Sequence, residues 1–135
     1  MATATLENIS RQYTDLDLNF GIHRVKKDVT VHLNEYAIIN SVKNLVLTNF
    51  YERPFRPQVG SNVRRHLFEN VDQLTGSQLE RSITETISNF EPRVKVKSTT
   101  AIPSYDENGY KIVLEFYIIN NPNPVIIDFF LERIR

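Results

Sequence analysis

The chain has 135 residues, the length of one ordinary domain, and such a domain buries roughly two thirds of its unfolded surface. Sixteen Lys and Arg residues balance sixteen Asp and Glu residues, so no long-range attraction to nucleic acid or anionic lipid is expected. The absence of cysteine excludes disulfides, thiolate metal sites and a cysteine nucleophile. No apolar stretch has the length of a membrane span, so we expect a soluble, unexported protein.

Residues 1–33 are predicted to form an extended arm at the start of a single domain, 1–135. Leu16, Leu18 and Phe20 alternate with polar residues, which places three apolar side chains on one side of a short extended segment. An arm of this kind needs another surface on which its apolar side can lie.

The next part of the chain, 34–92, shows the apolar spacing of helices. We expect three helices, near residues 34–48, 62–69 and 76–90. Asn34 is placed to cap the first helix, and Leu33 is placed to pack on Ile38 as a hydrophobic staple. The last helix should begin near Thr75 or Ser77, because either residue has a glutamine or glutamate three positions later to complete a capping box.

The stretch "NFEPR" joins the last predicted helix to the C-terminal part of the chain. Proline disfavours a helical conformation for the residue before it, so the helix should stop near Phe90 and leave Glu91 extended. Pro92 thus explains the helix end, but not the charges of Glu91 and Arg93 on either side of it. The two charges are either solvated at a simple helix stop or used in a contact with a partner.

From residue 93 the apolar period changes to two, which predicts an antiparallel meander over residues 93–135. Its strands are expected near residues 93–102, 110–119 and 124–134. Val94, Val96 and Ile102 should share one face of the first strand, and Asn108-Gly109 suits the turn before the second. The predicted fold class is therefore α+β, with the helices packed on one face of a three-stranded C-terminal sheet.

The last predicted strand is apolar on both faces. One face carries Val125, Ile127, Phe129 and Leu131, and the other carries Ile126, Phe130 and Ile134. A terminal strand of this kind invites aggregation unless something covers or extends it. Two interpretations are open, because the strand is either buried within its own domain or is an edge that docks a partner.

Patterns typical of catalysis or metal binding are weak. His23, His32 and His66 show no metal-ligand spacing, the few glycines form no phosphate loop, and no nucleophile has a base nearby. The basic run at residues 64–66 is more typical of a solvated face than of a phosphate site. Several carboxylates could be paired for glycosidic-bond cleavage, but none is distinguished: Glu35, Glu52, Glu69, Asp72, Glu80, Glu85 and Glu91. We predict no catalytic residue, metal or cofactor.

Three motifs together resemble those of a known family. They are "YTDLDLNF" at 13–20, "VKNLVLTNFYERPFRPQVGSNVRRHLFE" at 42–69 and "EPR" at 91–93. In order and spacing they are similar to the small baseplate wedge proteins of T-even-type contractile phages, which are related to baseplate subunits of type VI secretion systems and R-type pyocins. The family loop corresponds here to Glu52, Arg53, Pro54, Phe55, Pro57 and Gly60. The chain departs from the family at Phe50-Tyr51, where glycine is frequent, and at Val59, where an aromatic is frequent.

The resemblance implies a structural, non-enzymatic role as a sheath initiator near the tail tube and central spike. The first sheath ring would add strands to the C-terminal strand, where the docking residues would be Val125, Ile127, Phe129, Phe130 and Leu131. Glu91, Pro92 and Arg93 would contact the core bundle of larger wedge proteins. The implied partners are these wedge proteins, the tail sheath protein, and hub, spike or tube proteins. Several copies would enter the virion baseplate during assembly in the bacterial cytoplasm, with no nucleic-acid or membrane partner.

Two other classes of function remain open at this point. Some members of the family have been described as acidic lysozymes, and clearance of peptidoglycan by the purified protein would support that activity. A bacterial anti-adapter protein shares the domain, so a regulatory binding protein is the other alternative. Neighbouring tail sheath and wedge genes would support the structural role, whereas an isolated stress-response gene would support the regulator.

Overall fold

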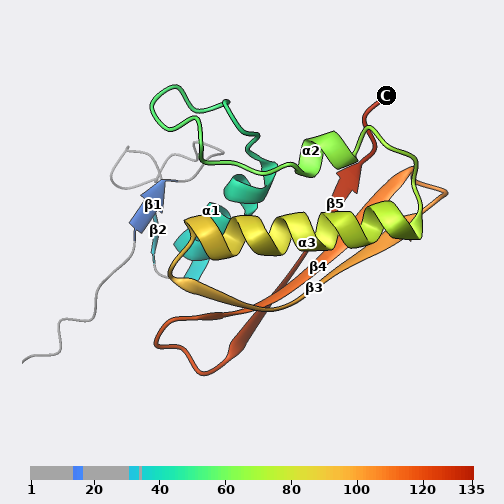
Figure 1. The fold of residues 1–135 in the computed structure, drawn as a ribbon. Helices are drawn as coiled ribbons and strands as arrows, with labels where there is room; N and C mark the ends of the chain where they lie inside the picture. Colours follow the sequence, from blue (N-terminus) through green and yellow to red (C-terminus); the bar gives the residue numbers. More distant parts are fainter. Residues whose placement is uncertain (1–13, 17–30, 34) are drawn as a thin grey trace, which may run out of the picture.

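A computed structural model describes residues 14–16, 31–33 and 35–135 (Figure 1). Helices α1 (Glu35–Leu47), α2 (Val63–His66) and α3 (Gln73–Phe90) precede strands β3 (Val94–Ser104), β4 (Gly109–Ile118) and β5 (Pro124–Glu132). Near the start of the chain, β1 (Thr14–Leu16) pairs antiparallel with β2 (Val31–Leu33). The predicted α+β class, with a three-stranded antiparallel sheet at the C-terminus, is confirmed. The expected contacts of Leu18, Phe20, Asn34 and the Leu33 side chain lie outside the described residues.

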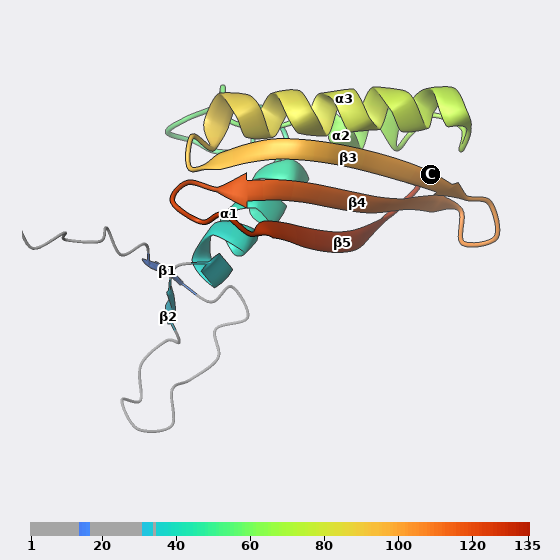
Figure 2. The same ribbon diagram turned by 90° about the horizontal axis from the view of Figure 1, so that it is seen from below.

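The core lies between the helices and one face of the sheet. The strand order is β3-β4-β5, with both pairs antiparallel. β4 alternates as predicted, and its inward side chains are fully or almost fully buried: Tyr110, Ile112, Leu114, Phe116 and Ile118. Val42 and Val46 of α1 and Leu79, Ile83 and Ile87 of α3 cover them. Helix α3 runs beside β3, and β5 forms the opposite edge (Figure 2).

Helix α3 begins earlier than the sequence predicts. Its N-cap is Asp72, whose extended backbone lets a carboxylate oxygen accept the Thr75 amide at 2.6 Å. The prediction of a start near Thr75 or Ser77 is therefore wrong, because Thr75 already lies in the first turn of the helix and is buried. The hydroxyl of Tyr110 accepts the Asp72 amide at 3.0 Å, so the position of the cap depends on a contact with the sheet.

A bulge in β3 changes which of its side chains face the core. Val96 pairs with Phe116 and Ser98 pairs with Glu115, so Lys97 is an extra residue on this strand. Beyond the bulge the alternation is inverted, and Ala101 rather than Ile102 points into the core. The prediction that Ile102 shares a face with Val94 and Val96 is wrong, because a single extra residue reverses every later side chain.

The turns on either side of β4 contain residues with left-handed backbone. Asn108 has φ 53° and ends a four-residue turn, so the Asn-Gly hairpin signal is correct but the loop is longer than two residues. A Cβ at Gly109 would collide with the Leu131 carbonyl oxygen and would lie 2.5 Å from the Phe130 ring. Glycine is required there because Phe130 folds across it. Asn120, with φ 69°, supports the second turn.

Candidate assembly site

Strand β5 exposes one edge of the sheet. Within the described residues it pairs with β4 and with no other strand. The Arg133 amide donates to the Asn108 carbonyl at 2.9 Å, and the Ile119 amide donates to the Arg93 carbonyl at 2.9 Å. Hydrogen-bonded and non-bonded pairs alternate along an antiparallel ladder, so the Arg133 bond makes the odd-numbered residues of β5 the ones bonded to β4. The Ile119 bond directs the odd-numbered residues of β4 toward β3 and leaves the even-numbered ones for β5, which gives the same result. The amides of β5 at 125, 127, 129 and 131 face β4, and those at 126, 128 and 130 face outward.

The two apolar faces of β5 have different surroundings. On the inner face, Ile127 and Leu131 are buried in the domain's own core, and Val125 and Phe129 pack against it. On the outer face, Ile126 is 64% exposed and Phe130 is 43% exposed. The inner face of this strand is therefore buried within its own domain, whereas the outer face is open.

The alternation predicted Ile134 on the outer face with Ile126 and Phe130, and this prediction is wrong. The strand ends at Glu132, and the Ile134 amide then donates to the Leu67 carbonyl at 2.9 Å. This bond turns the chain toward α2, so the Ile134 side chain packs against the core. A pattern continued past the end of a strand no longer describes its faces.

The opposite edge of the sheet, along β3, is blocked. The Glu80 carboxylate of α3 accepts the Ala101 amide at 2.7 Å, and the Thr84 and Thr99 hydroxyls are 3.0 Å apart. Pro103 has no amide to offer, and the bulge at Lys97 interrupts the ladder. Of the two edges, β5 is the one whose backbone groups can accept another strand.

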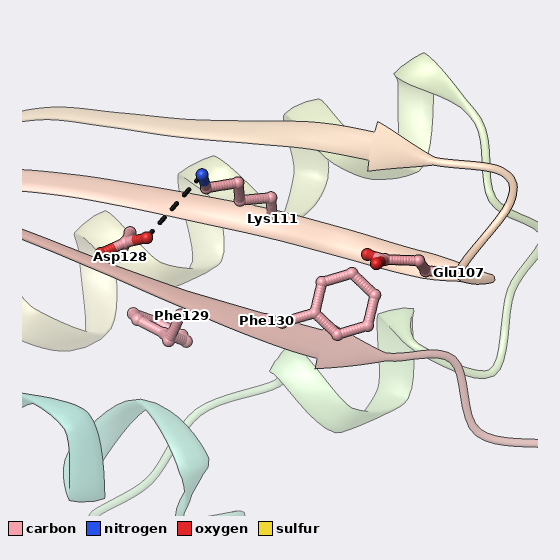
Figure 3. Close-up of a pocket in the computed structure, with 5 residues that line it drawn as sticks. All are labelled: Glu107, Lys111, Asp128, Phe129 and Phe130. Carbon is pink, nitrogen blue, oxygen red and sulfur yellow. Dashed lines mark ion pairs between the residues drawn. The ribbon is translucent and has the colours of Figure 1, made fainter.

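A hollow of about 560 Å³ lies over the end of β5, lined by Glu107, Lys111, Asp128, Phe129 and Phe130. Figure 3 shows the Phe130 ring in front of the strands and facing the Glu107 side chain at the turn. Lys111 and Asp128 approach each other across the strand pair at 3.8 Å, and both side chains are exposed. The hollow therefore combines an apolar ring with two carboxylates and one ammonium group.

The charges of the "NFEPR" junction are not two solvated groups. Glu91 is only 4% exposed, and its carboxylate is held by the Arg93 guanidinium through Nε at 2.6 Å and Nη2 at 2.7 Å. The Ser41 hydroxyl of α1 donates to the same carboxylate at 2.8 Å. Both alternatives of the sequence analysis, solvation and contact with a partner, placed the Glu91 charge at the surface; the carboxylate is instead buried, with Arg93 and Ser41 as the partners that a buried carboxylate requires. The helix does stop at Phe90 as predicted; Glu91 leaves the helical conformation with φ −123° and ψ 84°, and Pro92 is exposed.

The ionisation of Glu91 follows from these contacts. Burial by itself would raise the pKa of the Glu91 carboxyl, but the hydrogen bonds from Arg93 and Ser41, together with the charge of Arg93, hold it below its usual value. The charged form is thus stabilised inside the protein. The junction is an internal ion pair whose cation, 28% exposed in its side chain, lies between the core and the surface.

The family loop, residues 49–61, is tied at its base and exposed at its tip. Asn49 and Ser61 form a parallel bridge, the Tyr51 amide donates to the Pro57 carbonyl at 2.7 Å, and the buried Ser61 hydroxyl donates to the Val46 carbonyl at 2.7 Å. Tyr51 has φ 66°, a conformation that favours glycine and that this chain builds with tyrosine. Phe55 is 98% exposed. The loop is therefore a braced projection.

Sequence reasoning did not predict the contacts of four residues that position these features: Ser41, Ser61, Glu80 and Asp128. Ser41 lies 50 positions from Glu91, and Glu80 lies 21 positions from Ala101, so no local pattern indicates either contact. Asp128 interrupts an apolar run, which was the one available signal for an outward-facing position. Within the described residues, no cluster of three or more His, Asp or Glu side chains could hold a metal ion. The helices described are all too short or too polar to cross a bilayer.

Comparison with known proteins shows the family. The profile of the family described as baseplate wedge protein gp25 matches residues 33–123, which include the braced loop and the buried ion pair. The baseplate wedge protein gp25 of Enterobacteria phage T4 is 32% identical over 120 residues, covering 89% of this chain and 90% of that protein. This chain belongs to the gp25 family of baseplate wedge proteins. It is a structural component of a contractile-tail baseplate, as the three motifs predicted.

Solved structures share the fold at lower identity. A chain in the anti-feeding prophage baseplate superposes with a TM-score of 0.71 at 20% identity, covering 83% of this chain and 90% of that one. A chain of the postcontracted pyocin R2 baseplate gives 0.58 at 19% identity, with coverage of 73% and 96%. A Geobacter sulfurreducens protein with the provisional description of tail lysozyme gives 0.69 at 22% identity, with coverage of 75% and 92%.

Proposed function

We propose that this wedge protein initiates the tail sheath by accepting a strand from the first sheath ring along the free edge of β5. The observation that carries the proposal is the difference between the two edges of the sheet. The β3 edge is capped by Glu80 and interrupted by Pro103, whereas the β5 edge directs the backbone groups of 126, 128 and 130 outward. Strand addition draws its affinity from such main-chain groups and its register from alternate side chains.

We propose two different roles for the predicted docking residues, according to the face of β5 on which each lies. The inner-face residues Val125, Ile127, Phe129 and Leu131 give β5 its position, since their amides face β4 and their side chains pack against or enter the core. Phe130 is the predicted docking residue that remains open on the outer face. The contacts with an added strand fall to Phe130 and to Ile126 and Asp128, which were not among the predicted docking residues.

For the contact with larger wedge proteins, we propose that Pro92 and the exposed part of Arg93 meet their core bundle. Glu91 would act on this contact indirectly, because its carboxylate fixes the plane of the Arg93 guanidinium. The protein would then bridge the wedge core at one end of the sheet and the sheath at the β5 edge, beside hub, spike or tube proteins. We further propose that several copies enter each baseplate during assembly in the host cytoplasm.

A non-enzymatic role fits the carboxyl groups better than a lysozyme does. A glycosidase needs a general acid whose pKa is raised. The pKa values of Asp72 and Glu91, two of the seven carboxylates considered above, are instead lowered, through hydrogen bonds from Thr75 and from Arg93 and Ser41 respectively, and Lys97 lowers that of Glu115 in the same way. Each of these carboxylates holds a structural contact.

The test of sheath initiation is an outward-facing proline in β5. Ile126→Pro removes a backbone donor that faces away from β4, and Phe130→Asp places a charge on the open face. Both variants should fold and enter baseplates, and electron microscopy should show baseplates without sheath. Ile102→Asp is the matched control, since Ile102 is an exposed apolar residue on the blocked β3 edge. Full-length sheaths on Ile126→Pro baseplates would overturn the proposal.

A further inference from the structure

The outward positions of β5 carry alternating chemistry. Ile126, Asp128, Phe130 and Glu132 all direct their backbone groups away from β4, and their side chains lie on the outer face. Along the strand they read apolar, acidic, apolar, acidic. On the basis of the strand addition proposed above, we infer that β5 accepts a strand whose outer face alternates apolar residues with Lys or Arg. Asp128 and Glu132 select this strand by their charge.

The two acids are available for this purpose. Asp128 meets Lys111 at 3.8 Å, and both side chains are more than half exposed, so the pair is weak and leaves the carboxylate open to a second cation. Glu132 forms no ion pair with any described residue. Glu107, which faces the Phe130 ring in Figure 3, adds another carboxylate at the same end of the strand. The free edge is therefore acidic although the chain as a whole is neutral.

The alternation determines the complementary partner in either direction. Residues directly opposite each other on neighbouring strands have Cβ atoms about 5 Å apart, and opposite charges at this spacing stabilise the pair. A strand running antiparallel or parallel to β5 would in both cases present an apolar residue to Ile126 and to Phe130, and a basic residue to Asp128 and to Glu132. Two such charge pairs change a dissociation constant about 2- to 30-fold.

The same acids disfavour two antiparallel pairings of β5 with a second copy that place apolar residues opposite each other. If two β5 strands paired antiparallel with Ile126 opposite Phe130, the two Asp128 carboxylates would face each other. If Phe130 faced Phe130, Asp128 would lie opposite Glu132. Like charges directly opposite are destabilising, and charged residues are a known protection of exposed sheet edges. The edge is thus open to a basic strand, and in these two registers its acids disfavour pairing with a second copy.

The test uses the whole chain and three blocked nine-residue peptides, which match the length of β5. All carry isoleucine at the second and sixth positions and alternating threonine and valine at the odd positions. The fourth and eighth positions are Lys, Ser or Glu. The Lys peptide should bind about 2- to 30-fold more tightly than the Ser peptide, and the Glu peptide should bind most weakly. The double variant Asp128→Lys/Glu132→Lys should reverse this order. The control Glu85→Lys, which reverses an exposed acid on α3 away from the edge, should keep it.

The outcomes separate this inference from the proposed function. Equal binding of all three peptides that Ile126→Pro abolishes would refute charge selection and leave strand addition intact. A Lys preference that survives Ile126→Pro would refute strand addition at this edge and the inference with it. No binding by any peptide would refute the inference. In sedimentation, Asp128→Asn/Glu132→Gln should self-associate more than the unchanged chain, and equal behaviour would refute the protection against self-pairing.

Discussion

The buried ion pair at the helix end yields the sharpest prediction on stability. Glu91→Gln keeps the shape of the side chain but removes the charge that compensates Arg93. Removing one partner of a buried pair costs about 3 to 5 kcal/mol. Here the Gln oxygen can still accept one hydrogen bond, and Arg93 reaches water with 28% of its side chain, so we expect a loss of about 2 to 3 kcal/mol.

The loss should be visible in urea and thermal unfolding of the purified chain. For a domain of this length, 1 kcal/mol shifts the melting temperature by roughly 3 to 5 °C, so Glu91→Gln should melt about 10 °C lower. Glu85→Gln is the control, because Glu85 pairs with Arg81 at 3.0 Å on the exposed face of α3, and its loss should cost about 0.5 kcal/mol or less. If Glu91→Gln were as mild as the control, the pair would contribute no net stability, and our account of the junction would be refuted.

Three further predictions concern acid stability, the strand ladder and the loop. Folding lowers the pKa of Glu91, so its contribution to the free energy of unfolding is complete above the ordinary carboxyl value of about 4.3. That contribution is lost as the pH falls through the pKa of the folded state. In urea titrations at acid pH, the stabilities of Glu91→Gln and of the unchanged chain should therefore converge. A difference that stays constant with pH would contradict this. Ile127→Pro removes an amide that faces Leu114 and should lower the free energy of unfolding by about 3 kcal/mol or more, measured by thermal unfolding. Ile126→Pro should lower it by about 1 kcal/mol. Equal losses would show that the inward and outward amides are misassigned. Gly60→Ala would place a Cβ 2.5 Å from the Asn49 backbone carbon. The variant should therefore lose about 1 to 3 kcal/mol of the free energy of unfolding, and proteolysis should cut its loop faster. An unchanged rate of proteolysis would mean that the base of the loop can shift.

The sequence alone determined the elements and the family. The period of two in β4 and the apolar stripe of α3 are local signals, since each follows from the geometry of its own element. The helix stop at Pro92 is equally local, because the proline ring acts on the residue before it. The family followed from motifs whose residues are near neighbours in the chain. None of these inferences required knowing which distant segments meet.

The tertiary structure decided which groups are buried and which are open. Glu91 is an internal partner rather than a surface charge because Ser41, 50 residues away, lies beside it. Ile102 is exposed because one bulge residue reverses the faces of β3, and a bulge is defined only by the register with β4. The β5 edge is the open one because Glu80 of α3 covers the Ala101 amide on the other edge. Desolvation, register and edge protection depend on pairs of residues far apart in the chain, so the folded arrangement alone assigns them.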